Sequence, residues 1–362
     1  MKDTKLCRSR LAKSLAKHLV VLLACLAPLA TLACGWIDDQ SQGRAIVYVK
    51  DKDGNKDLYE VRLSNPGAEK NLTRTSDSNE SAPRVSPNGK LIAFQVKSSG
   101  QIGVDVIKRD SQEPERHKVT TVPGIRFSAA SSQRWSPDSN RIAYVAKNNA
   151  ETLAYVVNKD GETNRIRLTT LPVDDVGGWS KDGKNIVFAV HSGKDKGVYI
   201  RNPDGVDQIR VTEEYDISPV WSPDSTKIAF ISHRNGPPDI YVANKDRTGL
   251  WEHPSKITND NAPEYGISWS PDSSLLLFVS EKDGNPEVYT FNVESREIKR
   301  LTHNNQEDTQ PVWSPNGNMI AFVSYPDGDS PKGHAEIFYM SKDGSAQTRL
   351  TNNAHDDTSP SW

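Results

Sequence analysis

The sequence predicts an all-β fold, and three observations lead to this prediction. The 362 residues contain 23 glycines and 22 prolines spread along the chain, and both residue types interrupt helices. No helical periodicity of useful length follows residue 43. Instead, a short phrase rich in Trp, Ser and Pro returns at nearly constant intervals, which indicates a small β-unit repeated along the chain.

The first 33 residues have the layout of an export signal. Six basic residues and one acidic residue crowd the first 17 positions, and fifteen uncharged residues follow from Leu19 to Ala33. The run ends in Thr-Leu-Ala-Cys34, which resembles the lipobox of bacterial lipoprotein signals. We predict that residues 1–33 are cleaved and that residues 34–43 are a lipidated Cys34 with a short tether. An ordinary cleaved signal with an incidental Cys34 and an uncleaved anchor are the alternatives.

The remainder, residues 44–362, reads as one repeated unit. The phrase Trp-Ser-Pro-Asp, or a close variant, occurs at Trp135, Trp179, Trp221, Trp269 and Trp313. A degenerate copy stands at Val85 and a truncated one ends the chain at Trp362. Successive spacings are 50, 44, 42, 48, 44 and 49 residues. A period of about 40–50 residues is typical of the four-stranded blade of a β-propeller.

Each unit predicts four strands, named A to D from the inside of the ring to the outside. In the fifth unit, Pro219–Ser222 is a short apolar strand A, and the Ser-Pro-Asp turn follows because Pro presets φ and Asp tolerates the next position. Residues 228–231 and 239–242 are apolar and form strands B and C. Segments such as 298–302 alternate polar and apolar residues, as a half-exposed strand D does.

Counting these strands predicts seven blades. The first B–C–D set, from Ala45, has no strand A before it, and the last strand A, Thr358–Trp362, has no B–C–D set after it. The C-terminal strand is therefore expected to complete the N-terminal blade, which closes the ring and removes exposed sheet edges. The predicted fold is an all-β, seven-bladed propeller of four-stranded antiparallel blades.

The repeated phrase resembles the WD40-like, or PD40, repeats of TolB-type β-propellers, and the likeness covers residues 44–362. TolB itself carries an additional α/β domain before a six-bladed propeller, whereas here residues 35–43 precede the first strand and seven blades are counted. The same propeller precedes the hydrolase domain of prolyl-oligopeptidase-like enzymes, but the sequence contains no G-x-S-x-G motif. The repeat tryptophans are expected to form the inter-blade core rather than aromatic binding platforms, because Trp buries a large area and recurs once per blade. They are Trp135, Trp179, Trp221, Trp269, Trp313 and Trp362.

A second recurrence consists of acidic residues five positions before the Trp positions. Six of the seven positions are acidic, and Ala130 takes the third. The acidic residues are Glu80, Asp174, Asp216, Glu264, Asp308 and Asp357. We expect them near the channel mouth, where two interpretations stay open. Each carboxylate accepts hydrogen bonds in its own loop, or together they attract a basic peptide segment or Ca²⁺.

The B–C loops are expected on the same face as these acidic residues, and loops on a rigid scaffold are where recognition usually occurs. An insertion at Arg247–Ser255, with Trp251 at its centre, is expected on the opposite face. No histidine pair has metal-ligand spacing. Some polysaccharide lyases with a propeller fold collect a metal from histidines on separate blades, so spacing alone does not exclude such a site.

These features predict a non-enzymatic lipoprotein of the bacterial envelope, on the periplasmic face or the cell surface. It is expected to bind an envelope protein or peptide at the channel-mouth face, without catalytic residues and without a cofactor. A propeller stabilised by Ca²⁺ is a further alternative. The absence of a basic stripe excludes nucleic acid as a partner. The alternative is a metal-dependent, lyase-like carbohydrate-active enzyme or a sugar-binding protein, which metal analysis of the purified protein would separate. The oligomeric state is not predicted.

Overall fold

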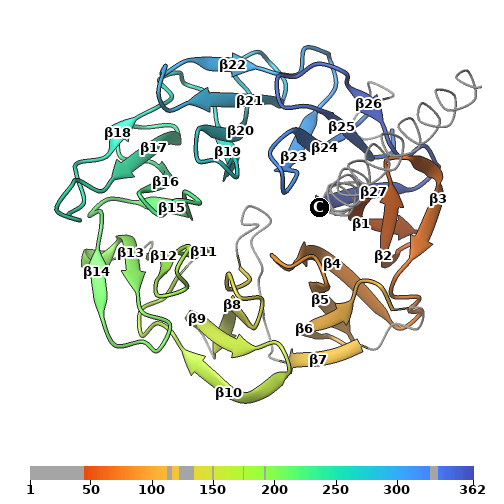
Figure 1. Ribbon diagram of the computed structural model, residues 1–362, viewed down its shortest axis with the longest axis horizontal. Helices are drawn as coiled ribbons and strands as arrows, with labels where there is room; N and C mark the ends of the chain where they lie inside the picture. The colour runs from red at the N-terminus through yellow and green to blue at the C-terminus, as the bar shows by residue number, and fades with distance from the viewer. Residues whose placement is uncertain are drawn as a thin grey trace, which may run out of the picture. The chain divides into compact units, whose positions relative to one another are not determined.

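Seven antiparallel sheets follow one another around a ring (Figure 1), as the sequence predicts. The computed structural model describes residues 45–111, 116–121, 134–148, 151–173, 175–190, 193–326 and 333–362. The leader and the tether lie outside these ranges. Ala45–Trp362 forms one compact unit. Its described part contains strands and one 3₁₀ turn, η2 (Gly193–Asp195), and no helix there is long and apolar enough to span a membrane.

The strands of each blade follow in the order A to D. Blade 1 consists of β27 (Asp356–Ser361), β1 (Ala45–Lys52), β2 (Asn55–Arg62) and β3 (Asn65–Asn71). Blade 2 consists of β4 (Ser78–Val85), β5 (Leu91–Ser98), β6 (Gln101–Lys108) and β7 (Arg116–Thr121). Blade 3 consists of β8 (Arg141–Asn148), β9 (Glu151–Asn158) and β10 (Gly161–Arg167). Its strand A position is marked by an isolated bridge between Trp135 and Ile142.

The remaining four blades have shorter strands. Blade 4 consists of β11 (Asp175–Trp179), β12 (Ile186–Val190), β13 (Gly197–Arg201) and β14 (Gln208–Arg210). Blade 5 consists of β15 (Asp216–Trp221), β16 (Lys227–Ser232), β17 (Asp239–Asn244) and β18 (Ser255–Lys256). Blade 6 consists of β19 (Glu264–Trp269), β20 (Leu275–Ser280), β21 (Glu287–Asn292) and β22 (Ile298–Arg300). Blade 7 consists of β23 (Asp308–Trp313), β24 (Met319–Ser324), β25 (Glu336–Ser341) and β26 (Thr348–Arg349).

The C-terminal strand closes the ring in the predicted way. β27 pairs antiparallel with β1, with Val47 opposite Ser361 and Lys50 opposite Asp357. The first six residues of β1 are buried, because their side chains pack against blade 7 on one face of the sheet and against blade 2 on the other. The two termini of the folded unit therefore share one sheet.

The repeated phrase packs as a blade core. The Trp indoles lie between blades, and four of them donate a hydrogen bond to a carbonyl of the preceding inner strand, as Trp179 Nε1 does to Arg134 O at 2.9 Å. The aromatic residue of strand B stacks on an aromatic residue of strand C, as in Phe278 and Tyr289 with ring centroids 5.6 Å apart. These cross-strand and inter-blade contacts explain why the same residue types return in each unit.

The Ser-Pro-Asp turns join strands A and B through side-chain hydrogen bonds. In blade 6, Ser270 Oγ donates to Asp272 Oδ1 at 2.6 Å and accepts from Leu275 N at 2.9 Å. Three turns carry Ser rather than Gly in the left-handed region, and Ser225 has φ of 62°. Its hydroxyl accepts a hydrogen bond from Lys181 N of the neighbouring blade at 2.8 Å, which links successive turns.

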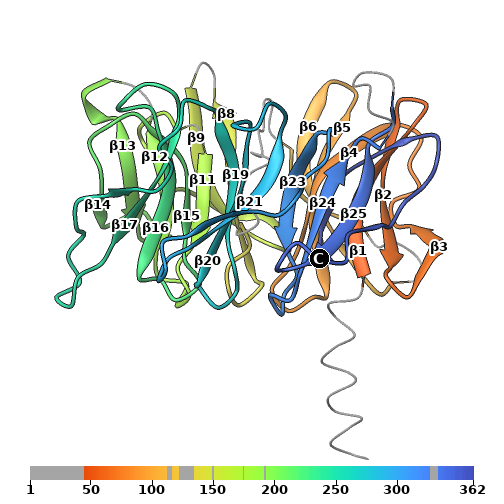
Figure 2. The same ribbon diagram turned by 90° about the horizontal axis from the view of Figure 1, so that it is seen from above.

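The propeller has two distinct ends, seen from the side in Figure 2. The A–B turns and the C–D connections lie at one end, called here the A–B end. The D–A and B–C connections lie at the other, called here the B–C end. Strands B and C of blades 1 to 3 are eight residues long, against five or six in blades 4 to 7.

Candidate functional site

The described members of the predicted acidic set lie in five different blades, each near the start of strand A, at the B–C end. Asp174, like Ala130, lies outside the described residues. The other five carboxylates are buried, with at most 2% of each residue exposed. The described members are Glu80, Asp216, Glu264, Asp308 and Asp357. They lie beneath the surface of the ring, so a macromolecular partner would meet the loops above them rather than the carboxylates.

Each buried carboxylate has its own hydrogen-bond donors. Both oxygens of Asp216 accept from Arg234 Nη2, at 2.9 and 3.1 Å. Glu264 accepts from Thr258 Oγ1 at 2.8 Å, and Thr258 belongs to the preceding blade. The Thr258 contact joins the end of blade 5 to the beginning of blade 6, whereas Arg234 and Asp216 both belong to blade 5. Asn304 and Asn353, from the D–A connections, donate to Asp308 and Asp357, and Ser78 of the same strand donates to Glu80.

A second set of buried carboxylates stands near the start of strand C, and sequence reasoning missed it. Glu287 Oε1 accepts from Arg300 Nη2 at 2.7 Å, and Glu336 Oε1 accepts from Arg349 Nη2 at 2.9 Å. The other members are Asp57 and Asp239, whereas the buried Asp105 of blade 2 lies further along its strand, opposite Phe94. The sequence signal that could have revealed them is a dipeptide after strand D, in which an aliphatic residue precedes a Thr. The hydroxyl of that Thr forms a hydrogen bond with strand C.

Thr351 shows how the two sets are connected. Its Oγ1 accepts from Ile337 N at 2.9 Å and donates to Glu336 Oε2. It also lies close enough to hydrogen-bond with Asp357 on the inner strand of the next blade. The same threonine-centred arrangement recurs with Thr73, Thr258 and Thr302. These networks hold the B–C and D–A connections in fixed positions.

Burial shifts the proton affinity of the inner carboxylates. Desolvation raises the pKa of Glu264 to about 8 and that of Glu80 to about 7. Desolvation likewise raises the pKa of Asp357 to about 7 and that of Asp308 to about 6, although the side-chain hydrogen bonds that they accept act in the opposite direction. These four carboxylates therefore change charge between about pH 6 and pH 8.

The free energy of unfolding is expected to fall as the pH rises from about 5 to about 9. A carboxyl with a raised folded-state pKa keeps a proton that the unfolded chain has already lost. Its contribution is full below the unfolded pKa and disappears as the pH rises through the folded value. The four groups act in the same direction, so their contributions to this fall in stability add. Urea denaturation at a series of pH values measures this slope.

Glu264→Gln is the control for this pH dependence. The amide keeps the size of the side chain and an acceptor for Thr258 but cannot titrate, so the slope between pH 5 and pH 9 should become shallower. A wild-type protein whose stability is flat or rises over this range would contradict the assignment.

A polar pocket of about 310 Å³ opens at the B–C end of blade 2. Gln101, Asp105, Arg116 and Lys118 are among the residues that line it, together with the end of strand β5. Arg116 forms ion pairs with Asp105 and, at 3.5 Å, with Glu80, so the floor of the pocket belongs to the buried network. Its rim includes the short turn between β5 and β6.

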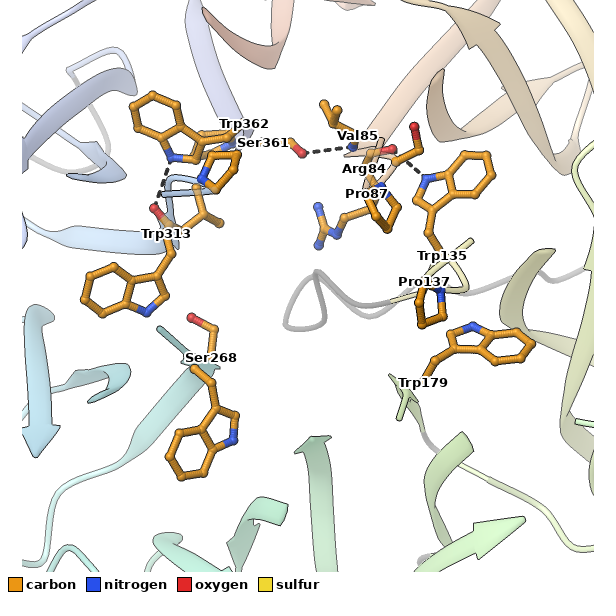
Figure 3. A pocket seen from close by; sticks show the side chains of 15 residues that line it. Arg84, Val85, Pro87, Trp135, Pro137, Trp179, Ser268, Trp313, Ser361 and Trp362 are labelled. Atoms are coloured by element: carbon orange, nitrogen blue, oxygen red, sulfur yellow. Dashed lines mark hydrogen bonds between the residues drawn. The ribbon is translucent and has the colours of Figure 1, made fainter. Parts of the chain in front are cut away.

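A larger pocket, of about 380 Å³, lies at the A–B end, where the inner strands meet (Figure 3). Its wall is mostly Trp and Pro side chains from several blades, and the Arg84 side chain extends toward its interior. Burial, and then the neighbouring Arg134, lowers the pKa of Arg84 to about 9. Five of the six repeat tryptophans line this pocket while packing between blades, all except Trp221.

A metal site and Trp251 are the remaining candidates from the sequence. In the part of the chain that the structure describes, no group of three or more His, Cys, Asp or Glu side chains is arranged to hold a metal ion. Trp251, at the centre of the blade 5 insertion, is half-buried and packs on Trp221 with ring centroids 5.7 Å apart. His191 lies outside the described residues.

Solved structures show a similar fold. TolB from Acinetobacter baumannii superposes with a TM-score of 0.59 at 18% identity, over 88% of this chain and 66% of that chain. An oligogalacturonate lyase in complex with manganese gives 0.62 at 15% identity, over 83% of this chain and 86% of that chain. The β-propeller domain of the Trilobed protease from Pyrococcus furiosus gives 0.64 at 16% identity, over 86% and 95%. No protein-family model and no curated protein matches the sequence.

These likenesses concern the fold. A similar fold occurs in a TolB protein, a lyase and a protease, so the fold does not decide between a binding scaffold and an enzyme. This chain spans 66% of the length of the A. baumannii TolB chain. The chain has a TolB-like β-propeller fold, in the seven-bladed form that its repeats predict.

Proposed function

We propose that the protein is a non-enzymatic scaffold of the bacterial envelope, anchored through a lipidated Cys34, that binds a protein or peptide partner at the B–C end. The observation that carries the proposal is the construction of this end. The paired strands B and C are longest in blades 1 to 3, so their hairpins are joined by short turns, and carboxylate networks hold the connections beneath them. A rigid scaffold with projecting loops loses little conformational entropy when it binds a partner.

The binding surface is proposed to centre on the blade 2 hairpin and its pocket. Gln101 and Lys118 are exposed at the rim, while Asp105 and Arg116 pair at the floor. This surface offers hydrogen-bond donors and acceptors of both charges, which suits a polar protein loop or an extended peptide. The buried inner carboxylates contribute by fixing the loops and do not touch the partner.

Exchange of charge at this rim tests the proposal. Lys118→Glu is expected to weaken capture of envelope partners by the full chain about tenfold or more, because it places a negative charge beside Asp105. Lys184→Glu, at an exposed A–B turn of blade 4, is the matched control and should bind as the wild type does. Quantitative pulldown from solubilised envelopes measures both. Equal loss with the two variants, or no loss with either, would place the partner elsewhere.

A further inference from the structure

The connection between β17 and β18, residues 245–254, is the longest C–D connection of the ring. It projects at the A–B end, the same side on which β1 begins and the C-terminus lies (Figure 2). Leu250, at its tip, is 68% exposed. The large hydrophobic residues that stand out as exposed in the described ranges all belong to the segment from 206 to 250, and Val206 occupies the C–D connection of the adjacent blade 4.

The tip is a preformed turn rather than a loose loop. Asp246 Oδ1 accepts from Thr248 N at 2.8 Å and from Leu250 N at 2.9 Å. Leu250 O in turn accepts from Asp246 N at 2.8 Å. Both backbone polar groups of Leu250 are therefore satisfied within the turn, and its side chain is held outward.

The base of the connection is fixed to the blade. Trp251 packs on Trp221, and the Lys245 ammonium lies 5.1 Å from the Trp251 ring and 5.4 Å from the Trp221 ring. Arg247 is exposed between this base and the tip. The connection therefore carries an exposed leucine, an aromatic residue after it and the cations Lys245 and Arg247, beside the carboxylates of Asp246 and Glu252. A leucine, an aromatic ring and cations together favour a membrane–water interface.

The position of Ala45 indicates what this end faces. Val47 pairs with Ser361, so the start of β1 lies at the A–B end beside the C-terminal Trp362. Ten residues separate Cys34 from Ala45. An extended segment of that length reaches at most about 35 Å, which is comparable to the width of a small domain. A lipid on Cys34 would keep the A–B end close to the bilayer.

We propose that the β17–β18 connection is a membrane-contacting element, in which Leu250 enters the headgroup region of the bilayer and Arg247 meets anionic headgroups. The inference rests on the lipid anchor of the proposed function. The satisfied backbone of Leu250 favours its entry, because an unpaired N–H or C=O is costly to transfer out of water. The second consequence is orientation: the B–C end points away from the membrane and stays open to a partner.

Site-directed fluorescence tests this inference in the full chain. The sequence has no Cys after Cys34, so Leu250→Cys introduces the sole thiol of residues 35–362 for an environment-sensitive probe. Asn261→Cys, exposed in the D–A connection at the B–C end, is the matched control. Lipidated protein would be reconstituted into vesicles of phosphatidylethanolamine and phosphatidylglycerol, with brominated lipid as the quencher and flotation as the measure of anchoring.

The expected result is a blue-shifted emission and at least several-fold stronger quenching at position 250 than at position 261. Equal quenching at the two positions in protein that floats with the vesicles would overturn the membrane contact and leave the anchor intact. Failure of the lipidation-competent protein to float, as also expected for Cys34→Ser, would overturn the anchor and the contact together.

Discussion

Deletion of residues 356–362 is expected to prevent the propeller from closing. These residues form strand A of blade 1 and supply Trp362, which packs in one cluster with Ile46, Tyr48 and Ile337. Without them, β1 loses its inner partner and exposes an apolar edge, which is a template for aggregation. The loss exceeds the about 3–5 kcal/mol expected for truncating a buried Trp alone, against a typical total stability of about 5–15 kcal/mol.

Size-exclusion chromatography and thermal unfolding of the deleted chain measure this effect. Trp362→Ala is the graded control, since it removes the indole and its hydrogen bond to Val312 O at 3.2 Å but keeps the strand. It should remain folded with a reduced urea midpoint. A deleted chain that is monomeric and unfolds at the wild-type temperature would show that β27 does not hold the ring together.

Gly177→Ala is expected to be the most damaging single substitution of an inner strand. A Cβ atom at Gly177 would lie 1.7 Å from Pro219 O and 2.8 Å from Val187 Cγ1. The first contact is with backbone of the neighbouring blade, which cannot rotate away, so β11 and β15 would have to separate. Overpacking of this kind costs about 1–3 kcal/mol where side chains can adjust, and here more than that is expected.

Gly67→Ala is the matched control for this prediction. Gly67 lies in the outer strand β3, and nothing stands within 4 Å of a Cβ built there. Its replacement should change the free energy of unfolding by less than about 0.5 kcal/mol. Urea denaturation of both variants makes the comparison. A Gly177→Ala protein as stable as Gly67→Ala would mean that the inner strands of blades 4 and 5 are not in close contact.

These two changes should also affect function, because each blade of the ring is in contact with its neighbours. Its inner strands contact one another through indoles, turn hydroxyls and threonine-centred carboxylate networks. A substitution that separates two inner strands should therefore also disturb the loops at the B–C end. Partner capture by Gly177→Ala, measured at a temperature at which it remains folded, would report that connection.

Sequence periodicity predicted the architecture because each blade repeats the same turn and the same packing contacts. The Ser-Pro-Asp turn needs its Ser and Asp side chains for hydrogen bonds, the strand B aromatic residue needs a partner on strand C, and the Trp fills the space between blades. All three requirements are local or nearest-neighbour contacts. Blade 3 is the exception among the inner strands, where the described residues leave a single bridge at Trp135.

The candidate site was predicted less completely. The offset of five residues located the inner carboxylates in sequence, but their burial followed from packing between successive blades. The carboxylates of strand C, such as Glu287 and Glu336, showed no constant offset from the repeated phrase, because the B–C loops between them differ in length. The pairing of Arg234 with Asp216 likewise depends on how a loop folds back over strand A.

The sequence by itself determined the class of fold, the number of blades and the strand that closes the ring. It could do so because strand alternation, turn chemistry and the repeat period are properties of short segments. The tertiary structure alone decided that the acidic residues are buried, that the two ends of the propeller differ, and that Leu250 and Val206 project at the end where Ala45 begins. The burial of a side chain and the end of the propeller at which a loop lies depend on which segments meet around the ring. Both are decided by contacts between residues that are far apart in the chain.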